Sequence, residues 1–373
     1  MNTPNIRFKG FGGDWEQRKV SELFKVTRGY VLAAPETDEM PSDEKPYPVY
    51  SSQTKNNGLM GYYKNYLYEN AITWTTDGAN AGTVCYRAGK FYCTNVCGVL
   101  LSDEGYSNKM VAEALNTIAW KHVSKVGNPK LMNNVMSEIE ICIPKTVDEQ
   151  VKISEYFDNL DNLITLHQRK CNSMKQVKKY MLQKMFPKQG EKVPEIRFKG
   201  FTDDWEQRKL GDCCREFKSG SFIPASDIEE SGEYPVFGGN GLRGYTSEYN
   251  HDGEFALIGR QGALCGNMNY STGKAYFTEH AVAVQANDSA DTKFMYYLLG
   301  KMNLGQYSDQ SAQPGLAVGK LVKMEGLFPS VDEQKKIGKH LASIDNLITL
   351  HQRKSDSLIE IKKFMLQNMF PNK

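Results

Sequence analysis

A glycine-rich segment, Gly239-Asn-Gly-Leu-Arg-Gly244, has the residue pattern with which dinucleotide-binding proteins hold a pyrophosphate. That chemistry needs a helix directly after the glycines, because the helix N-terminus binds the phosphates. The residues that follow, Tyr245-Thr-Ser-Glu-Tyr249, do not favour a helix, and a related segment earlier in the chain reads Asn56-Asn-Gly-Leu-Met-Gly61. We therefore interpret the glycine-rich segment as a turn.

Cys93 and Cys97 have the spacing of metal ligands, but no second Cys or His pair follows at the distance of a zinc site. We interpret the eight cysteines as reduced thiols of a cytoplasmic protein. No P-loop is present, and neither is the Asn- or Asp-Pro-Pro-aromatic motif of adenine methyltransferases. We expect no metal and no cofactor in this chain.

Asp356, Glu360 and Lys362 could form the carboxylate cluster of a nuclease. A solvated helix face is the simpler interpretation, because a long helical pattern carries all three and its repeat has Asn172, Gln176 and Lys178 in their places. With the other motifs interpreted structurally, we expect no catalytic residue. A metal-dependent nuclease stays open as a minor alternative.

Length and charge restrict the class of protein. The 373 residues suffice for two domains with a core each, and 40% are hydrophobic, as in globular proteins. The net charge of +2 means that any affinity for nucleic acid must come from local groups or from partners. The start has no signal-peptide core, and no apolar run of about 18 residues occurs. We expect a cytoplasmic protein without a membrane span.

The sequence blocks that must position any site occur twice in the chain. Ile6–Val20 returns as Ile196–Leu210 with 12 of 15 positions identical, and Val147–Lys188 returns as Val331–Asn372 with 25 of 42 identical. The segments between these repeats have diverged strongly. A retained frame with different inserts indicates one scaffold that presents two different binding modules.

The second repeated block predicts a long helix in each copy. Apolar residues recur at alternating steps of four and three from Ile153 to Met185 and from Ile337 to Met369, which is typical of a coiled coil. Each helix is expected to start after Val-Asp-Glu-Gln and to stop at Phe-Pro. We expect the two helices to pack antiparallel. Joining the chain's end to its start would recreate the internal junction, so we expect a near-circular, pseudo-twofold arrangement.

Each insert mixes strands with a helix, which predicts an α+β fold of two α/β globular domains. Residues 71–75, 84–86, 99–101 and 138–143 read as strands of the first insert, and 255–258 and 281–284 as strands of the second. Ser107 is expected to cap a helix in the first insert, and Asp291 one in the second.

Matched positions of the inserts differ mainly in polar side chains. Met60 corresponds to Arg243, Thr76 to Arg260, Asp77 to Gln261 and Asn95 to Glu279. Such side chains distinguish base edges by their donors and acceptors. Candidate DNA-binding residues of the first insert are Gln53, Lys55, Asn56, Asn57, Tyr62, Thr76, Asn80, Lys90, Asn128 and Lys130. Those of the second are Asn240, Arg243, Tyr245, Arg260, Gln261, Lys274, Gln310 and Gln313.

The repeated frame resembles that of the specificity subunit of Type I restriction–modification enzymes. Asp14-Trp-Glu16 and Asp204-Trp-Glu206 precede the inserts, Val147-Asp-Glu-Gln150 and Val331-Asp-Glu-Gln334 lead into the helices, and Met-Phe-Pro187 and Met-Phe-Pro371 end them. Singly these motifs are weak, but their occurrence twice in the same order is specific. The resemblance covers nearly the whole chain.

The resemblance implies two target-recognition domains, residues 1–147 and 189–331, with antiparallel spacer helices at 148–188 and 332–373. Each domain would bind one half of an asymmetric, bipartite sequence in double-stranded DNA. The chain itself would be non-catalytic. It would assemble with two methyltransferase subunits and two restriction subunits, which would use S-adenosylmethionine, ATP and Mg²⁺. The alternative from another class is a scaffold whose inserts bind peptides or glycans.

Overall fold

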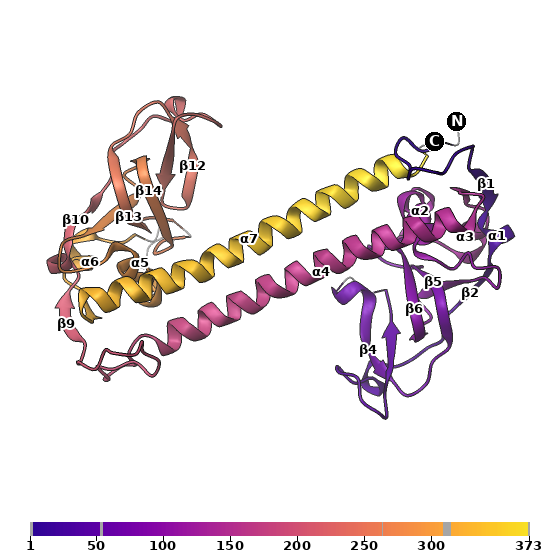
Figure 1. Cartoon of the computed structure of the whole chain (residues 1–373), viewed down its shortest axis with the longest axis horizontal. Helices are drawn as coiled ribbons and strands as arrows, with labels where there is room; N and C mark the ends of the chain where they lie inside the picture. The colour runs from indigo at the N-terminus through magenta and orange to yellow at the C-terminus, as the bar shows by residue number, and fades with distance from the viewer. Residues whose placement is uncertain (1–2, 53–54, 263, 309–314, 372–373) are drawn as a thin grey trace. The chain divides into compact units, whose positions relative to one another are not determined.

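The computed structural model describes residues 3–52, 55–262, 264–308 and 315–371. The chain divides into two compact units (Figure 1). Unit 1 comprises Met1–Gln168 and Arg353–Lys373, and unit 2 comprises Arg169–Gln352. Each unit therefore contains one insert and a segment of each long helix.

Unit 1 contains a six-stranded sheet of the order β2-β7-β5-β6-β3-β4. Its strands are β2 (Lys25–Arg28), β3 (Tyr47–Tyr50), β4 (Leu59–Tyr63), β5 (Tyr68–Thr75), β6 (Val84–Cys93) and β7 (Cys97–Leu101). A two-stranded sheet pairs β1 (Glu16–Lys19) with β8 (Glu140–Ile143). The helices of the insert are α1 (Val20–Leu23), α2 (Lys109–Ile118) and α3 (Asn133–Ser137).

Unit 2 repeats this topology with the strand order β10-β15-β13-β14-β11-β12. The strands are β10 (Cys214–Ser219), β11 (Tyr234–Gly238), β12 (Gly241–Thr246), β13 (His251–Gly259), β14 (Met268–Phe277) and β15 (Ala281–Ala286). Its two-stranded sheet pairs β9 (Glu206–Lys209) with β16 (Glu325–Phe328), and its short helices are α5 (Thr292–Lys301) and α6 (Val318–Leu321). The two inserts thus keep one α+β fold although their sequences differ.

Short 3₁₀ helices connect several of these elements. They lie at Ala34–Glu36, Lys55–Gly58, Ala119–His122, Gly211–Cys213, Ala225–Asp227 and Leu304–Tyr307.

The sheet of unit 1 buries apolar side chains on both faces, as alternation along a strand requires. One face places Ile72 and Trp74 in a core shared with Met110 of α2. The opposite face forms a smaller core that includes Cys93 and Cys97. Both of these cysteines are free thiols, and burial raises the pKa of Cys93 and raises that of Cys97 to about 11. Their chemistry is therefore that of small apolar core residues.

The strands expected in both inserts are present, but one helix cap was assigned wrongly. Helix α2 begins one residue later than expected, and the capping side chain is Asn108, which accepts from the N–H of Val111 at 3.0 Å. Ser107 instead donates to the carbonyl of Leu100 at 3.5 Å. In unit 2 the expected cap is confirmed, because Asp291 accepts from the N–H of Phe294 at 2.8 Å.

The two long helices are α4 (Val147–Lys184) and α7 (Val331–Met369). They end just before Phe-Pro, as expected, but they include the Val-Asp-Glu-Gln motif instead of following it. In unit 1, Phe157 of α4 stacks on Phe370 at 5.8 Å between ring centroids, and Asp161 binds Lys362. Residues further along α4 thus contact residues earlier in α7. Within this unit the helices pack antiparallel.

A buried ion pair explains why Glu recurs in the Val-Asp-Glu-Gln motif. Arg7 donates from Nε and Nη2 to the two carboxylate oxygens of Glu149, each at 2.7 Å. In unit 2, Arg197 makes the same bidentate contact with Glu333 at 2.8 Å. The Glu149 and Glu333 side chains are 2% and 0% exposed. The pair fixes the segment before each insert to the start of a long helix.

The segment near the start of the chain contacts the end of α7, and the segment that follows α4 contacts the end of α4 in the same way. The N–H of Ile6 donates to the carbonyl of Asn368 at 2.9 Å, and that of Ile196 donates to Lys184 at 2.9 Å. Trp15 packs edge-on against Phe370, and Trp205 packs likewise against Phe186. The expected equivalence of the two junctions is confirmed at the level of these contacts.

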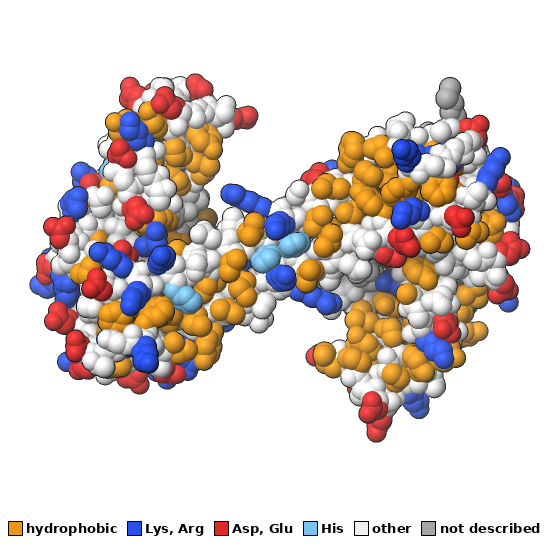
Figure 2. Space-filling view, in the orientation of Figure 1, with side chains coloured by type: hydrophobic (Ala, Val, Ile, Leu, Met, Phe, Trp, Pro, Cys, Tyr) orange, Lys and Arg blue, Asp and Glu red, His pale blue; other side chains and the backbone are white. Residues whose placement is uncertain are grey.

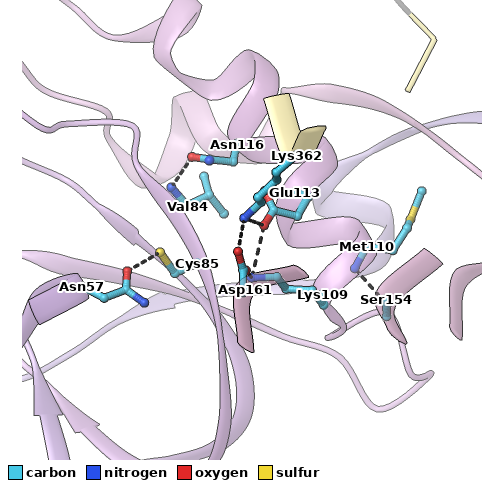
Figure 3. A network of polar contacts seen from close by, with 10 residues as sticks. All are labelled: Asn57, Val84, Cys85, Lys109, Met110, Glu113, Asn116, Ser154, Asp161 and Lys362. Carbon is cyan, nitrogen blue, oxygen red and sulfur yellow. Dashed lines mark hydrogen bonds and ion pairs between the residues drawn. The ribbon is translucent and has the colours of Figure 1, made fainter. Parts of the chain in front are cut away.

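A charged network joins the insert of unit 1 to the two long helices (Figure 3). Lys362 of α7 lies 2.7 Å from Asp161 and 2.9 Å from Glu113, and Lys109 contacts the same two carboxylates at 2.6 and 3.1 Å. The sequence interpretation, which placed Lys362 on a solvated helix face, was therefore wrong. Because the charge of Lys362 is matched by these acids, this residue holds α2 against the two long helices.

Unit 2 holds its insert with the same two helix residues and a different insert residue. Lys178 pairs with Asp345 at 2.6 Å, as Lys362 pairs with Asp161, and Tyr297 donates its hydroxyl to Asp345 at 2.7 Å. The frame residues are thus constant, while each insert supplies its own contact to them.

Candidate nucleic-acid interface

Three turns of each six-stranded sheet are joined by backbone hydrogen bonds, and we call this cluster of turns the loop edge. In unit 1 it is formed by the turns after β3, β5 and β6. The N–H of Thr94 donates to Tyr50 at 2.9 Å, and that of Thr76 donates to Val96 at 3.1 Å. In unit 2 the turns after β11, β13 and β14 are joined in the same way. The loop edge is therefore a rigid platform whose side chains can differ.

The loop edge of unit 1 surrounds a polar cavity of about 230 Å³. Two of the predicted DNA-binding residues, Asn57 and Asn80, line it together with Arg87. Asn57 accepts a weak hydrogen bond from the thiol of Cys85 at 3.5 Å (Figure 3). Asn56 and Asn57 both adopt left-handed backbone angles, with φ of 49° and 55°, a conformation that asparagine tolerates better than most residues.

Other predicted residues of unit 1 lie beside this cavity. Thr76 is buried, and its hydroxyl lies 3.0 Å from both the carbonyl of Val96 and the carboxylate of Asp77. Lys130 is exposed and lies 3.6 Å from Asp77, on a segment bonded to the turn after β5. Asn128 is exposed on the same segment. The exposed Asn128 and Lys130 are available to a ligand, whereas Thr76 contributes mainly to the platform.

The loop edge of unit 2 brings three predicted residues together. Asn240, Arg243 and Gln261 line a cavity of about 400 Å³ with Gly239, Gly262 and His280. All three side chains are exposed at its rim. Arg and the carboxamides of Asn and Gln read guanine and adenine edges, respectively. The arrangement is therefore suited to contact with a base pair.

Sequence comparison missed two residues at the loop edges, Arg87 and His280. His280 follows the position at which Asn95 is replaced by Glu279, and its ring lies 3.2 Å from the Glu279 carboxylate. Its place beside a substituted turn residue was a usable signal. Arg87 lies inside strand β6, and its sequence context gave no signal of a place at the loop edge. Arg260 is half-buried, and its side chain donates to Ser219 at 3.4 Å.

Four predicted residues lie away from the cavities and have the same surroundings in both units. The backbone of Tyr62 pairs with Asp38, as that of Tyr245 pairs with Glu229. The ammonium of Lys90 lies 4.6 Å from the centre of the Tyr66 ring, and that of Lys274 lies 4.5 Å from Tyr249. Because these contacts recur in both units, the four residues do not account for a difference between the units, and we assign them to the shared fold.

Three predicted residues, Gln53, Gln310 and Gln313, lie outside the described residues, as does the side chain of Lys55. In the part of the chain that the structure describes, no group of three or more His, Cys, Asp and Glu side chains is arranged to hold a metal ion. No helix among the described residues has both the length and the apolar character of a membrane span.

The retained helix sequence exposes apolar side chains at the same positions in both repeats. Leu163 and Leu166 of α4 are each 44% exposed, and their repeats Leu347 and Leu350 of α7 are 43% and 45% exposed. On the face shown in Figure 2, basic and acidic side chains are interspersed over each unit, with apolar side chains between them. Both repeats therefore present the same pair of exposed leucines on their long helix.

Known proteins show the same duplicated arrangement. The family described as "Type I restriction modification DNA specificity domain" matches residues 12–176 and again residues 202–360, which together make up most of the chain. The chain belongs to this family. Each match spans one insert and most of the following long helix, so the family's unit coincides with the repeat.

Individual relatives agree with this assignment. The specificity subunit of the Type I restriction enzyme EcoprrI of Escherichia coli is 44% identical over 41% of this chain and 39% of its own length. That of the enzyme MpnII of Mycoplasma pneumoniae is 34% identical over 42% of this chain and 47% of its own length. The matched segments thus span less than half of these curated relatives.

A solved structure extends the likeness over the whole fold. The S subunit of a Type I restriction–modification system from M. genitalium has a TM-score of 0.80 and covers 100% of both chains, at 18% identity. This family member shares the fold of two α+β domains with long helices.

Proposed function

We propose that this chain binds double-stranded DNA as the specificity subunit of a Type I restriction–modification complex, with each recognition domain reading one half of a bipartite, asymmetric sequence. One observation carries the proposal. Two domains of one fold are held by the same frame contacts, yet their loop edges present different polar side chains, such as Asn80 and Arg87 against Arg243 and Gln261. A duplicated catalytic domain would be expected to keep such residues.

The recognition domains in this proposal are residues 1–147 and 189–331, and the spacer helices are residues 148–188 and 332–373. The helices set the gap between the two half-sites, because a continuous helix is stiff over its length. The chain supplies recognition and no catalysis. Methyl transfer and cleavage belong to partner subunits, which use S-adenosylmethionine, ATP and Mg²⁺. We place the complex in the cytoplasm.

The two equivalent helix surfaces support a stoichiometry of two methyltransferase subunits per chain. Leu163 and Leu166 form one surface, and Leu347 and Leu350 form the other. Because the surfaces have the same residues, each fits one copy of the same partner. Two restriction subunits then complete the assembly.

Methylome sequencing of a host with and without the gene tests the proposal directly. We expect a bipartite methylated motif that depends on the gene. Exchanging residues 211–330 for those of a relative should change one half of the motif and leave the other half and the gap unchanged. A motif in which neither half responds to the exchange would refute the proposal. Binding that is insensitive to salt would instead favour a scaffold for peptides or glycans.

A further inference from the structure

The cavity at the loop edge of unit 1 contains a buried arginine that has no charge partner among the described residues. Arg87 is only 8% exposed. Its Nε donates to the Thr73 hydroxyl at 3.2 Å, and its guanidinium lies 3.8 Å from the centre of the Tyr50 ring. Among the described residues, no carboxylate forms an ion pair with it. A buried cation of this kind calls for an acceptor from outside the chain.

The surroundings orient this guanidinium toward a ligand. Stacking on Tyr50 fixes the plane of the fork, and the bond to Thr73 uses the inner nitrogen, so the two Nη groups remain for a ligand. Arg87 lines the same cavity as Asn57 and Asn80, whose amides also offer donors and acceptors. The cavity can thus admit a planar group with two adjacent acceptors.

Arg87 also differs between the domains, as a specificity residue must. It lies opposite Ala71 in the β5–β6 ladder, and the equivalent residue of unit 2, opposite Phe255, is Ser271. Unit 2 instead brings Arg243 of β12 to its own cavity, where unit 1 has Met60. Each domain therefore supplies one arginine to its loop-edge cavity, but from a different strand. A phosphate contact, common to both halves, would not require this difference.

We propose that Arg87 is a specificity-determining residue of the first domain and binds the O6 and N7 acceptors of a guanine. This inference rests on the proposed function and deepens it. The paired acceptors of guanine in the major groove match the arginine fork, and this contact is the commonest specific one between protein and DNA. The first half-site therefore contains at least one G·C pair.

The first test needs only the motif of the natural protein. Domain exchange identifies which half-site the first domain reads. A first half-site composed of A·T pairs alone overturns the role of Arg87 while leaving the proposed function intact. The absence of any motif that depends on the gene would overturn the proposed function itself.

The second test measures binding of the assembled methyltransferase complex to DNA with 7-deazaguanine at each guanine in turn. This base lacks the N7 acceptor. One substitution in the first half-site should weaken binding, but by less than the roughly 5- to 150-fold cost of losing a complete bidentate base contact, because O6 still accepts. The variant Arg87→Met, which keeps an unbranched apolar stem against Tyr50, should lose the full factor on natural DNA and show no further loss at that guanine.

A matched control is Arg243→Met, which should leave the first half-site's sensitivity unchanged. Equal loss on all sequences with Arg87→Met would show a phosphate contact and overturn the proposal. Should Arg87→Met fail to fold, the 7-deazaguanine scan with the natural protein still decides, because a first half-site without a sensitive guanine also overturns it.

Discussion

The ion pair between Arg7 and Glu149 should contribute more to stability than any exposed pair in the chain. Its two hydrogen bonds of 2.7 Å join side chains that are 14% and 2% exposed. Arg7→Met leaves the carboxylate of Glu149 buried and unpaired, which costs about 3–5 kcal/mol when one partner of a buried pair is removed. With an m-value of about 2 kcal/mol/M, the urea midpoint should fall by roughly 1.5–2.5 M.

The four tryptophans allow each unit to be observed separately. Trp15, Trp74 and Trp120 lie in unit 1, and Trp205 lies in unit 2. Fluorescence of a Trp205→Phe protein therefore reports the unfolding of unit 1, in which Arg7→Met should act. Replacing both members of the pair, Arg7→Met with Glu149→Leu, should recover part of the loss, because no buried charge remains.

The equivalent pair offers the control for this experiment. Arg197→Met in the Trp205→Phe background should leave the midpoint of unit 1 unchanged, because Arg197 binds Glu333 within unit 2. An Arg7→Met protein with an unchanged midpoint would contradict the reasoning. So would a double variant that is no more stable than Arg7→Met alone.

Three further predictions follow from the helices. Inserting four residues into the spacer helix at 148–188 adds about 6 Å, which is close to two base pairs at roughly 3.4 Å each. Methylome sequencing should therefore show a longer gap between the two half-sites. An unchanged gap would exclude a spacer role. Burial favours the neutral acid, but hydrogen bonds from Lys109 and Lys362 lower the pKa of Asp161 overall. The ionised Asp161 therefore stabilises the folded protein above the unfolded-state pKa, and this contribution is lost as pH falls through the folded-state pKa. Asp161→Asn should accordingly flatten the acid side of the stability profile in urea titrations, and a profile as steep as that of the natural protein would argue against this contribution. Finally, the double variant Leu166→Glu with Leu350→Glu should abolish binding of the methyltransferase subunit in size-exclusion assays without changing the urea midpoint. Either change alone should halve the amount of subunit bound. Full binding by the double variant would rule out these surfaces.

The sequence predicted the frame well because its determinants are local and repeated. The apolar period of the long helices and the Phe-Pro stops depend on neighbouring residues, and α4 and α7 end where these signals lie. The role of Glu149 could not be predicted, because its partner Arg7 is 142 residues away and only the folded chain brings them together.

The loop edges were predicted in part. Asn57, Asn80, Asn240 and Gln261 lie at turns and Arg243 lies near the start of β12, and the mismatches of Met60 with Arg243 and of Asp77 with Gln261 are visible in an alignment of the repeats. Arg87 escaped notice because it lies within a strand, and whether a strand residue points into a cavity depends on the curvature of the sheet. The shift of the α2 cap from Ser107 to Asn108 reflects two adjacent residues that can both cap a helix.

The matching junctions at Ile6 and Ile196 have a consequence for chains of half this length. A polypeptide made of one repeat would carry both the helix end and the segment that seats on it. Two copies could then complete each other's junctions and form a homodimer. Such a dimer would present one reading surface twice, so its target would be a palindrome with a central gap. Under the proposed function, fusion of the two repeats into one gene allows each half to evolve a separate DNA sequence preference.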